Sequence, residues 1–200
     1  MVSGNVPTVL VAVDDPDVRA RFQSWLTRDY RVETTTNGDG VLSAIEEADA
    51  VLVDCEFRTA AGTSVVDELE GRPAVRTTSI VHDCHGGARH CDIDDGLVRP
   101  VSRATLFETV DRLLRRGRYD ELVSECAMLA AKCGALEART GGRSALEFEG
   151  EYVAAQHRLE ELFSELDDLL RSFDGEDFRA AFETCTVEET SGPQRADERS

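Results

Sequence analysis

The chain has 200 residues with a hydrophobic fraction of 41%, which is enough for one large domain or for a medium domain followed by a small one. Its 40 acidic residues against 22 basic ones give a formal net charge of -18, which argues against sequence-independent binding to nucleic acid, because such binding needs clustered lysine and arginine. No apolar run approaches the roughly 20 residues that span a bilayer, so we expect a cytoplasmic protein outside the membrane.

The acidic excess is typical of a protein from a salt-adapted host. At 1 M salt the Debye length is only about 3 Å, so repulsion between surface carboxylates is largely screened. The local exception is a run of four arginines at positions 112, 115, 116 and 118, which we interpret as the solvated end of a helix. The six cysteines are expected to be reduced thiols in this compartment.

Residues 8 to 116, after a disordered lead at 1–7, alternate between apolar strands and amphipathic helices. Asp15-Pro16 predicts a helix start, and Ser102 is expected to cap a later helix. Strands alternating with helices predict an α/β fold, a doubly wound five-stranded parallel sheet of the flavodoxin-like kind. The predicted strands cover residues 8–13, 30–34, 50–54, 78–81 and 96–100.

Residues 117–183 follow a purely helical pattern. One seam of apolar residues runs from Tyr119 to Leu136 in steps of three and four, and a second runs from Tyr152 to Phe173. Gly141-Gly142 separates the two seams and predicts an antiparallel helical hairpin. Residues 184–200 are too polar to fold and are expected to be a disordered tail.

Carboxylates follow two of the predicted strands. Asp54 ends the uninterrupted apolar run that starts at Ala50, and Asp14-Asp15 follow the first strand. In open α/β sheets, ligands collect beyond the carboxyl ends of the strands, so these acids are expected on one rim. Three converging carboxylates repel one another unless they share a hard cation, and Mg²⁺ is the usual one.

With the acidic pair, Asp54 and the Arg99-Pro100 that ends the fifth strand in view, residues 8–116 resemble the receiver domain of two-component response regulators. The hairpin resembles the HalX domain, a module found behind receivers in haloarchaea. The stretches 166–168, 177–178 and 180–182 fit its closing segment. The resemblance implies a signalling protein and not an enzyme.

The resemblance also implies roles for single residues. Asp54 would accept a phosphoryl group from a histidine kinase, with Mg²⁺ held by Asp14, Asp15 and Asp54. Arg99 stands where receivers carry a phosphate-contacting lysine, and His82 stands at the switch position that usually holds threonine or serine. Counted back from Pro16, Val13 takes the place of the first acid of the family motif.

Two alternatives remain open. The receiver-like part could be a phosphorylation-independent adaptor that docks a protein partner, and the hairpin or the last receiver helix could pair with a partner or with a second copy. The stretch from 82 to 91 could instead bind metal or sense redox state, against the simpler interpretation of a polar loop. Its candidate ligands are His82, Cys84, His85, His90 and Cys91.

Overall fold

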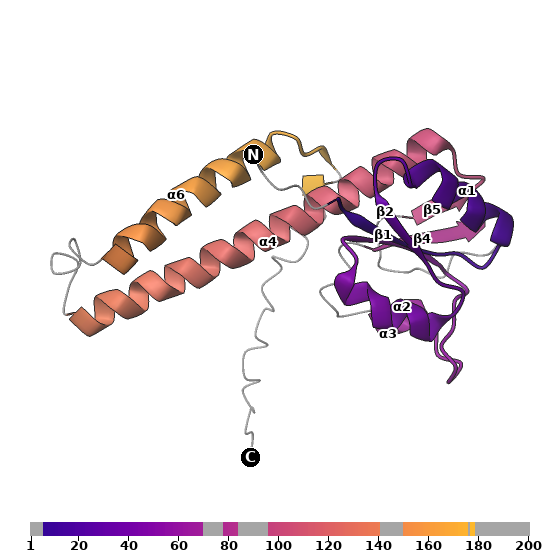
Figure 1. Ribbon diagram of the computed structural model, residues 1–200, viewed down its shortest axis with the longest axis horizontal. Coiled ribbons are helices and arrows are strands. Elements are labelled where there is room, and N and C mark those ends of the chain that lie inside the picture. Colours follow the sequence, from indigo (N-terminus) through magenta and orange to yellow (C-terminus); the bar gives the residue numbers. More distant parts are fainter. Residues whose placement is uncertain (1–5, 70–77, 84–95, 141–149, 176, 179–200) are drawn as a thin grey trace, which may run out of the picture.

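In the computed structural model, a parallel sheet forms the body of the protein, and two long helices extend from it (Figure 1). The structure describes residues 6–69, 78–83, 96–140, 150–175 and 177–178. All strand pairs are parallel, in the order β2-β1-β3-β4-β5. The strands are β1 (Thr8–Ala12), β2 (Arg31–Thr34), β3 (Ala50–Asp54), β4 (Thr78–Asp83) and β5 (Gly96–Arg99).

The predicted α/β class is confirmed, because helices cover both faces of this parallel sheet. Helix α1 and the first part of α4 pack on one face, and α2, η1 and α3 pack on the other. The helices are α1 (Pro16–Leu26), α2 (Gly38–Ala44), η1 (Ile45–Glu47), α3 (Val65–Leu69), α4 (Arg103–Thr140) and α6 (Gly150–Leu170).

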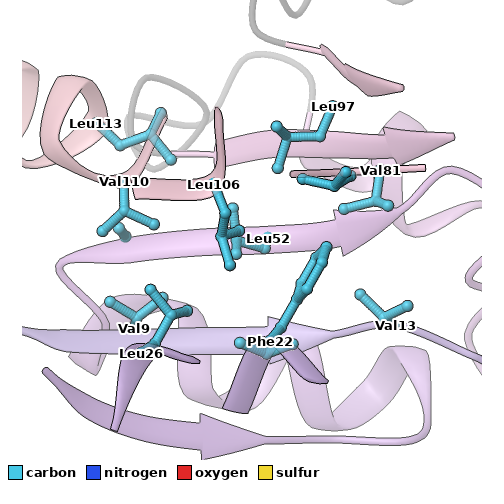
Figure 2. Close-up of a cluster of buried hydrophobic side chains, with 13 residues drawn as sticks. Val9, Val13, Phe22, Leu26, Leu52, Val81, Leu97, Leu106, Val110 and Leu113 are labelled. Atoms are coloured by element: carbon cyan, nitrogen blue, oxygen red, sulfur yellow. The ribbon is translucent and has the colours of Figure 1, made fainter. Parts of the chain in front are cut away.

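Branched apolar residues explain why β1 and β3 lie in the middle of the sheet. Every residue of β3 is buried, as a strand covered on both faces requires. Figure 2 shows the core on one face, where Val9 and Leu52 of the central strands meet Phe22 of α1 and Leu106 of α4. On the opposite face a second cluster joins Val51 and its neighbours to α2 and α3.

Helix starts agree with the capping residues read from the sequence. The side chain of Asp15 accepts hydrogen bonds from the backbone N–H groups of Asp17 and Val18, with Pro16 at the first helical position. The hydroxyl of Ser102 accepts a hydrogen bond from the N–H of Thr105. Strand β4 runs two residues further than predicted, because it keeps its ladder with β5 as far as Asp83.

Helix α4 is one continuous helix of 38 residues. Its first part covers the sheet, and its second part lies alongside α6 in an antiparallel pair (Figure 1). The boundary expected between residues 116 and 117 therefore falls inside α4. Gly117 disfavours helix by about 1 kcal/mol relative to alanine, which the buried Leu113 and Leu122 on either side outweigh.

Candidate functional site

Asp54 lies at the carboxyl end of the central strand β3 and is only 2% exposed. Strand pairing sets Ala12 of β1 beside Val53, so the next residue of that chain, Val13, follows on toward the level of Asp54. On the other side, Asp54 itself pairs with Val81 of β4. Burial of a carboxylate in this position costs free energy unless protein groups replace the hydrogen bonds to water that it has lost.

Arg99 replaces much of that water. Its Nη2 donates to Oδ2 of Asp54 at 2.5 Å, and the Asp54 side chain in this pair is 3% exposed. The backbone N–H of Glu56 donates to the other carboxylate oxygen at 3.1 Å. The chain thus brings together two of the predicted site residues, Asp54 and Arg99, from strands that are 45 residues apart in sequence.

Asp14 and Asp15 both lie after β1 but differ in exposure and in hydrogen-bond partners. Asp14 is exposed, and its backbone carbonyl accepts a hydrogen bond from Arg19. Asp15 caps helix α1 through one carboxylate oxygen. The backbone N–H of Val18, followed by that of Asp17, lowers the pKa of Asp15, and the positive charge of Arg99 adds a smaller lowering.

Magnesium binding by Asp14, Asp15 and Asp54 stays a prediction. Among the described residues, no group of three or more histidine, cysteine, aspartate or glutamate side chains is placed to hold a metal ion. Val13 is buried in the apolar core beside Phe22, where the family motif has its first acid (Figure 2). The protein group that supplies positive charge next to Asp54 is Arg99.

The switch position and the histidine- and cysteine-rich segment are only partly described. The backbone of His82 lies inside β4 and pairs with Val98 of β5. Cys84, His85, His90 and Cys91 lie outside the described residues. Metal binding or redox sensing by this segment therefore stays a prediction.

A second charged cluster, which the sequence did not suggest, lies where α4 leaves the sheet. Asp177, with an exposed fraction of 0%, accepts two hydrogen bonds from Arg115, at 3.1 and 2.7 Å. Arg116 adds a longer ion pair at 3.8 Å, and Arg118 pairs with Glu165 and Glu121. Arg115, Arg116 and Arg118 thus make intramolecular ion pairs inside α4, and Arg116 is buried, so the interpretation of this run as the solvated end of a helix is wrong.

The cluster also closes the hairpin. The N–H of Asp174 donates to Asp177, and the N–H of Asp177 donates back to Asp174, so a new helical turn starts just after α6. The rings of Tyr119, Phe173 and Phe178 pack next to this turn in tilted and edge-to-face contacts. In the sequence, the only local signal for this turn is that Asp177 follows Asp174 by three residues after a helix. The arginine that pairs with Asp177, Arg115, lies 62 residues earlier.

Comparison with known proteins agrees with this two-part organisation. Residues 115–182 match the HalX domain. A Haloferax volcanii protein, provisionally named a transcriptional regulator, is 30% identical over 137 residues. That match covers 66% of this chain but only 23% of the relative, so the chain spans less than a quarter of the curated relative's length.

Solved structures show the fold of the first part. The signal receiver domain of a protein from Vibrio parahaemolyticus, provisionally named Luxo repressor, is 19% identical with a TM-score of 0.50, covering 60% of this chain and 98% of that one. NtrX from Brucella abortus, in a complex with ADP, is 18% identical with the same TM-score, covering 60% of this chain and 30% of that one. At this identity the likeness concerns the fold alone.

The first part of the chain thus has the fold of a receiver domain, and residues 115–182 match the HalX domain. This agrees with the resemblance read from the acids, the strand-terminal Asp54 and the closing segment of the hairpin. Within the part of the chain that the structure describes, none of the helices has the length and apolar character of a membrane span.

Proposed function

We propose that this chain is a response-regulator-like signalling protein in which Asp54 receives the signal and the helical hairpin delivers it. One observation carries the proposal. The Asp54–Arg99 pair joins the end of the central strand to the end of β5, and α4 starts four residues after Arg99 and continues into the hairpin. A change in that pair acts directly on the segment that leads into α4.

The proposed input is a phosphoryl group from the phosphohistidine of a histidine kinase. A carboxylate oxygen of Asp54 attacks the phosphorus, an O–P bond forms, the P–N bond breaks, and its electron pair stays on the imidazole nitrogen. Arg99 stabilises the negative charge on the transferring oxygens, because its planar fork can bind phosphate through two N–H groups. The closed Asp54–Arg99 pair has to open first, since the carboxylate is almost fully buried.

The proposed output follows from the same residue. A phosphoryl group on Asp54 holds Arg99 in a new position, because its oxygens lie further from the strand end than the carboxylate oxygens do. Arg99 is the last residue of β5, and Ser102 caps α4 three residues later. Phosphorylation would therefore bias the start of α4 between two positions and carry this bias into the hairpin.

A second candidate function is a phosphorylation-independent adaptor. Three observations favour it: Val13 is buried in the core, Asp15 is used as a helix cap, and Arg99 already neutralises Asp54. In this case the pair is a fixed structural ion pair, and signalling depends on a protein partner alone.

Intact mass spectrometry can separate the two functions. Full-length protein in molar KCl is incubated with a small acyl phosphate, with Mg²⁺ and with a chelator in parallel. The phosphorelay function predicts the mass gain of one phosphoryl group, absent in Asp54→Asn. The matched control is Asp67→Asn, an exposed acid on α3, which should gain the group like the wild type.

Failure of the wild-type chain to gain any mass at saturating donor, in both the Mg²⁺ and the chelator sample, would contradict the phosphoacceptor proposal and leave the adaptor. A gain that persists in Asp54→Asn would contradict both the site and the mechanism.

A further inference from the structure

Directional contacts hold helix α4 at opposite edges of the sheet. The helix starts beside the end of β5, where Ser102 caps it. Further along, Asp111 of α4 accepts a hydrogen bond at 2.6 Å from the hydroxyl of Tyr30, the residue just before β2. Strands β5 and β2 are the two edges of the sheet. Helix α4 therefore crosses the sheet from one edge to the other and is held at both.

The contact at the β2 edge continues along α4 toward its start. Phe107, one turn before Asp111, packs its ring against that of Tyr30, with the centroids 6.0 Å apart and the planes tilted by 42°. One turn earlier, the guanidinium of Arg103 lies 5.2 Å from the centroid of the Phe107 ring, in a cation–π contact. Steps of four residues place the three α4 side chains on one stripe of the helix. We call Tyr30 with Arg103, Phe107 and Asp111 the Tyr30 brace.

The neighbouring stripe of α4 makes contacts of another kind. Figure 2 shows Leu106, Val110 and Leu113 in the apolar cluster on the sheet. Apolar burial is non-directional, so these contacts hold α4 against the sheet but define its rotation less sharply than a hydrogen bond does. A hydrogen bond weakens steeply when its donor and acceptor lose their alignment. The Tyr30 brace therefore sets the angle at which α4 lies on the sheet.

The hydrogen bond of the Tyr30 brace is directional and can also be replaced by water. Burial, followed by the hydrogen bond to Asp111, raises the pKa of Tyr30, so the hydroxyl keeps its proton and remains a donor. Asp111 is exposed, so water can take the place of the hydroxyl at little cost when the contact breaks. These properties suit a contact that opens and closes.

We propose that the Tyr30 brace holds α4 in its resting position on the sheet and opens when the start of α4 is displaced. Arg103 lies only four residues after Arg99, in the first turn of α4. A displacement at Arg99 therefore reaches the Tyr30 brace before it reaches the hairpin. The inference rests on the proposed function in one respect, that α4 is the output segment. A chain without the Tyr30 hydroxyl should have a loosened α4 even when Asp54 carries no phosphoryl group.

The test is amide hydrogen exchange of the full chain in molar KCl, without a phosphoryl donor, measured by mass spectrometry. Tyr30→Phe removes the hydroxyl and keeps the ring. Exchange in residues 103–114 of α4 should become about fivefold faster than in the wild type, as expected for the loss of one partly exposed hydrogen bond to a charged group. Exchange in β3 should stay at the wild-type rate, because the effect is local.

A double-mutant cycle identifies the partner of the hydroxyl. In a chain that already carries Asp111→Ala, Tyr30→Phe should cause no further acceleration, because its hydrogen-bond partner is gone. The cycle also cancels the change in helix propensity that Asp111→Ala brings. The same acceleration in both backgrounds would overturn the proposal.

Tyr152→Phe is the matched control. It loses a hydroxyl that also donates to a carboxylate at 2.6 Å, that of Glu137 in the hairpin. Residues 103–114 should exchange at the wild-type rate in this variant. Wild-type exchange in Tyr30→Phe, an equal acceleration in β3, or faster exchange of residues 103–114 in Tyr152→Phe would each overturn the proposal. Failure of Asp54 to gain a phosphoryl group would contradict the proposed function and leave this measurement unaffected, so the two failures are distinguishable.

Discussion

The sheet and the hairpin are stabilised in different ways. In the sheet, the central apolar residues are completely enclosed, with Val9, Leu52 and Leu106 at 0% exposure between two helical layers. In the hairpin, much of the seam is half-buried, and ion pairs accompany it from end to end. The sheet is thus held mainly by burial of apolar area, whereas the hairpin combines a smaller apolar seam with pairs of surface charges.

The largest effect is expected in the sheet. Leu52→Ala leaves a cavity in the enclosed core and should lower the free energy of unfolding by about 4 kcal/mol. Leu129→Ala, in the half-open seam, should lower it by about 1 kcal/mol, because neighbours and water can fill the gap. Urea unfolding followed by Trp25, which packs against the sheet core, and by circular dichroism would measure both. Equal losses of unfolding free energy in the two variants would contradict the proposed difference between the sheet and the hairpin.

The next largest effect is expected where the two regions meet. Asp177→Asn removes the charge that Arg115 contacts twice and should cost about 2 kcal/mol of hairpin stability, since part of the arginine still reaches water. Amide exchange at Phe178 should accelerate while exchange in β3 stays slow. Asp168→Asn, which removes an exposed ion pair with Arg171, should have almost no effect. Acceleration in β3 would show that the closing turn also supports the sheet.

Salt should raise the melting temperature of both regions. The net charge of -18 repels itself at low ionic strength, so the melting temperature should rise from low to molar KCl. The rise should be steeper in far-UV circular dichroism, to which the long helices α4 and α6 contribute most, than in Trp25 fluorescence. A flat curve for both signals would mean that the acidic excess lies mainly outside the folded parts.

The smallest effect is an acid sensitivity confined to the hairpin. The hydrogen bond from Arg158 lowers the pKa of Glu125 below its ordinary value of 4.5, with burial opposing. Because the folded-state pKa is the lower one, the stabilisation is present above about pH 4.5 and is lost as pH falls through the folded pKa. The difference in stability between wild type and Glu125→Gln should therefore shrink in acid. A difference that is constant with pH would contradict this role of the carboxylate.

Much of the sheet follows from patterns that operate over a few residues. The apolar run ending at Asp54, the Asp15-Pro16 helix start and the Ser102 cap each depend on near neighbours, and the structure has them where the sequence predicts them. The closeness of Asp54 and Arg99 could also be predicted, because both residues end strands of one parallel sheet.

The remaining features depend on which of two possible uses of a residue is more stable, or on contacts between distant parts of the chain. A local sequence pattern reveals neither. Asp15 suits a helix cap and a metal site equally well in sequence, and the structure uses its carboxylate for the cap. The change of pattern between residues 116 and 117 suggests a boundary between two domains, but burial on both sides keeps α4 whole. Asp177 finds Arg115 only when the hairpin has closed, which no spacing between them can indicate.

The unbroken course of α4 gives the molecule a lever. With 38 residues at 1.5 Å each, the helix is about 57 Å long, and its fulcrum is the sheet that holds its first turns. A tilt of only about 5° at the Arg103 end would swing the Thr140 end by about 5 Å, roughly one helical turn. A displacement too small to rearrange the sheet would therefore be large enough at the far end to admit or expel a neighbouring helix.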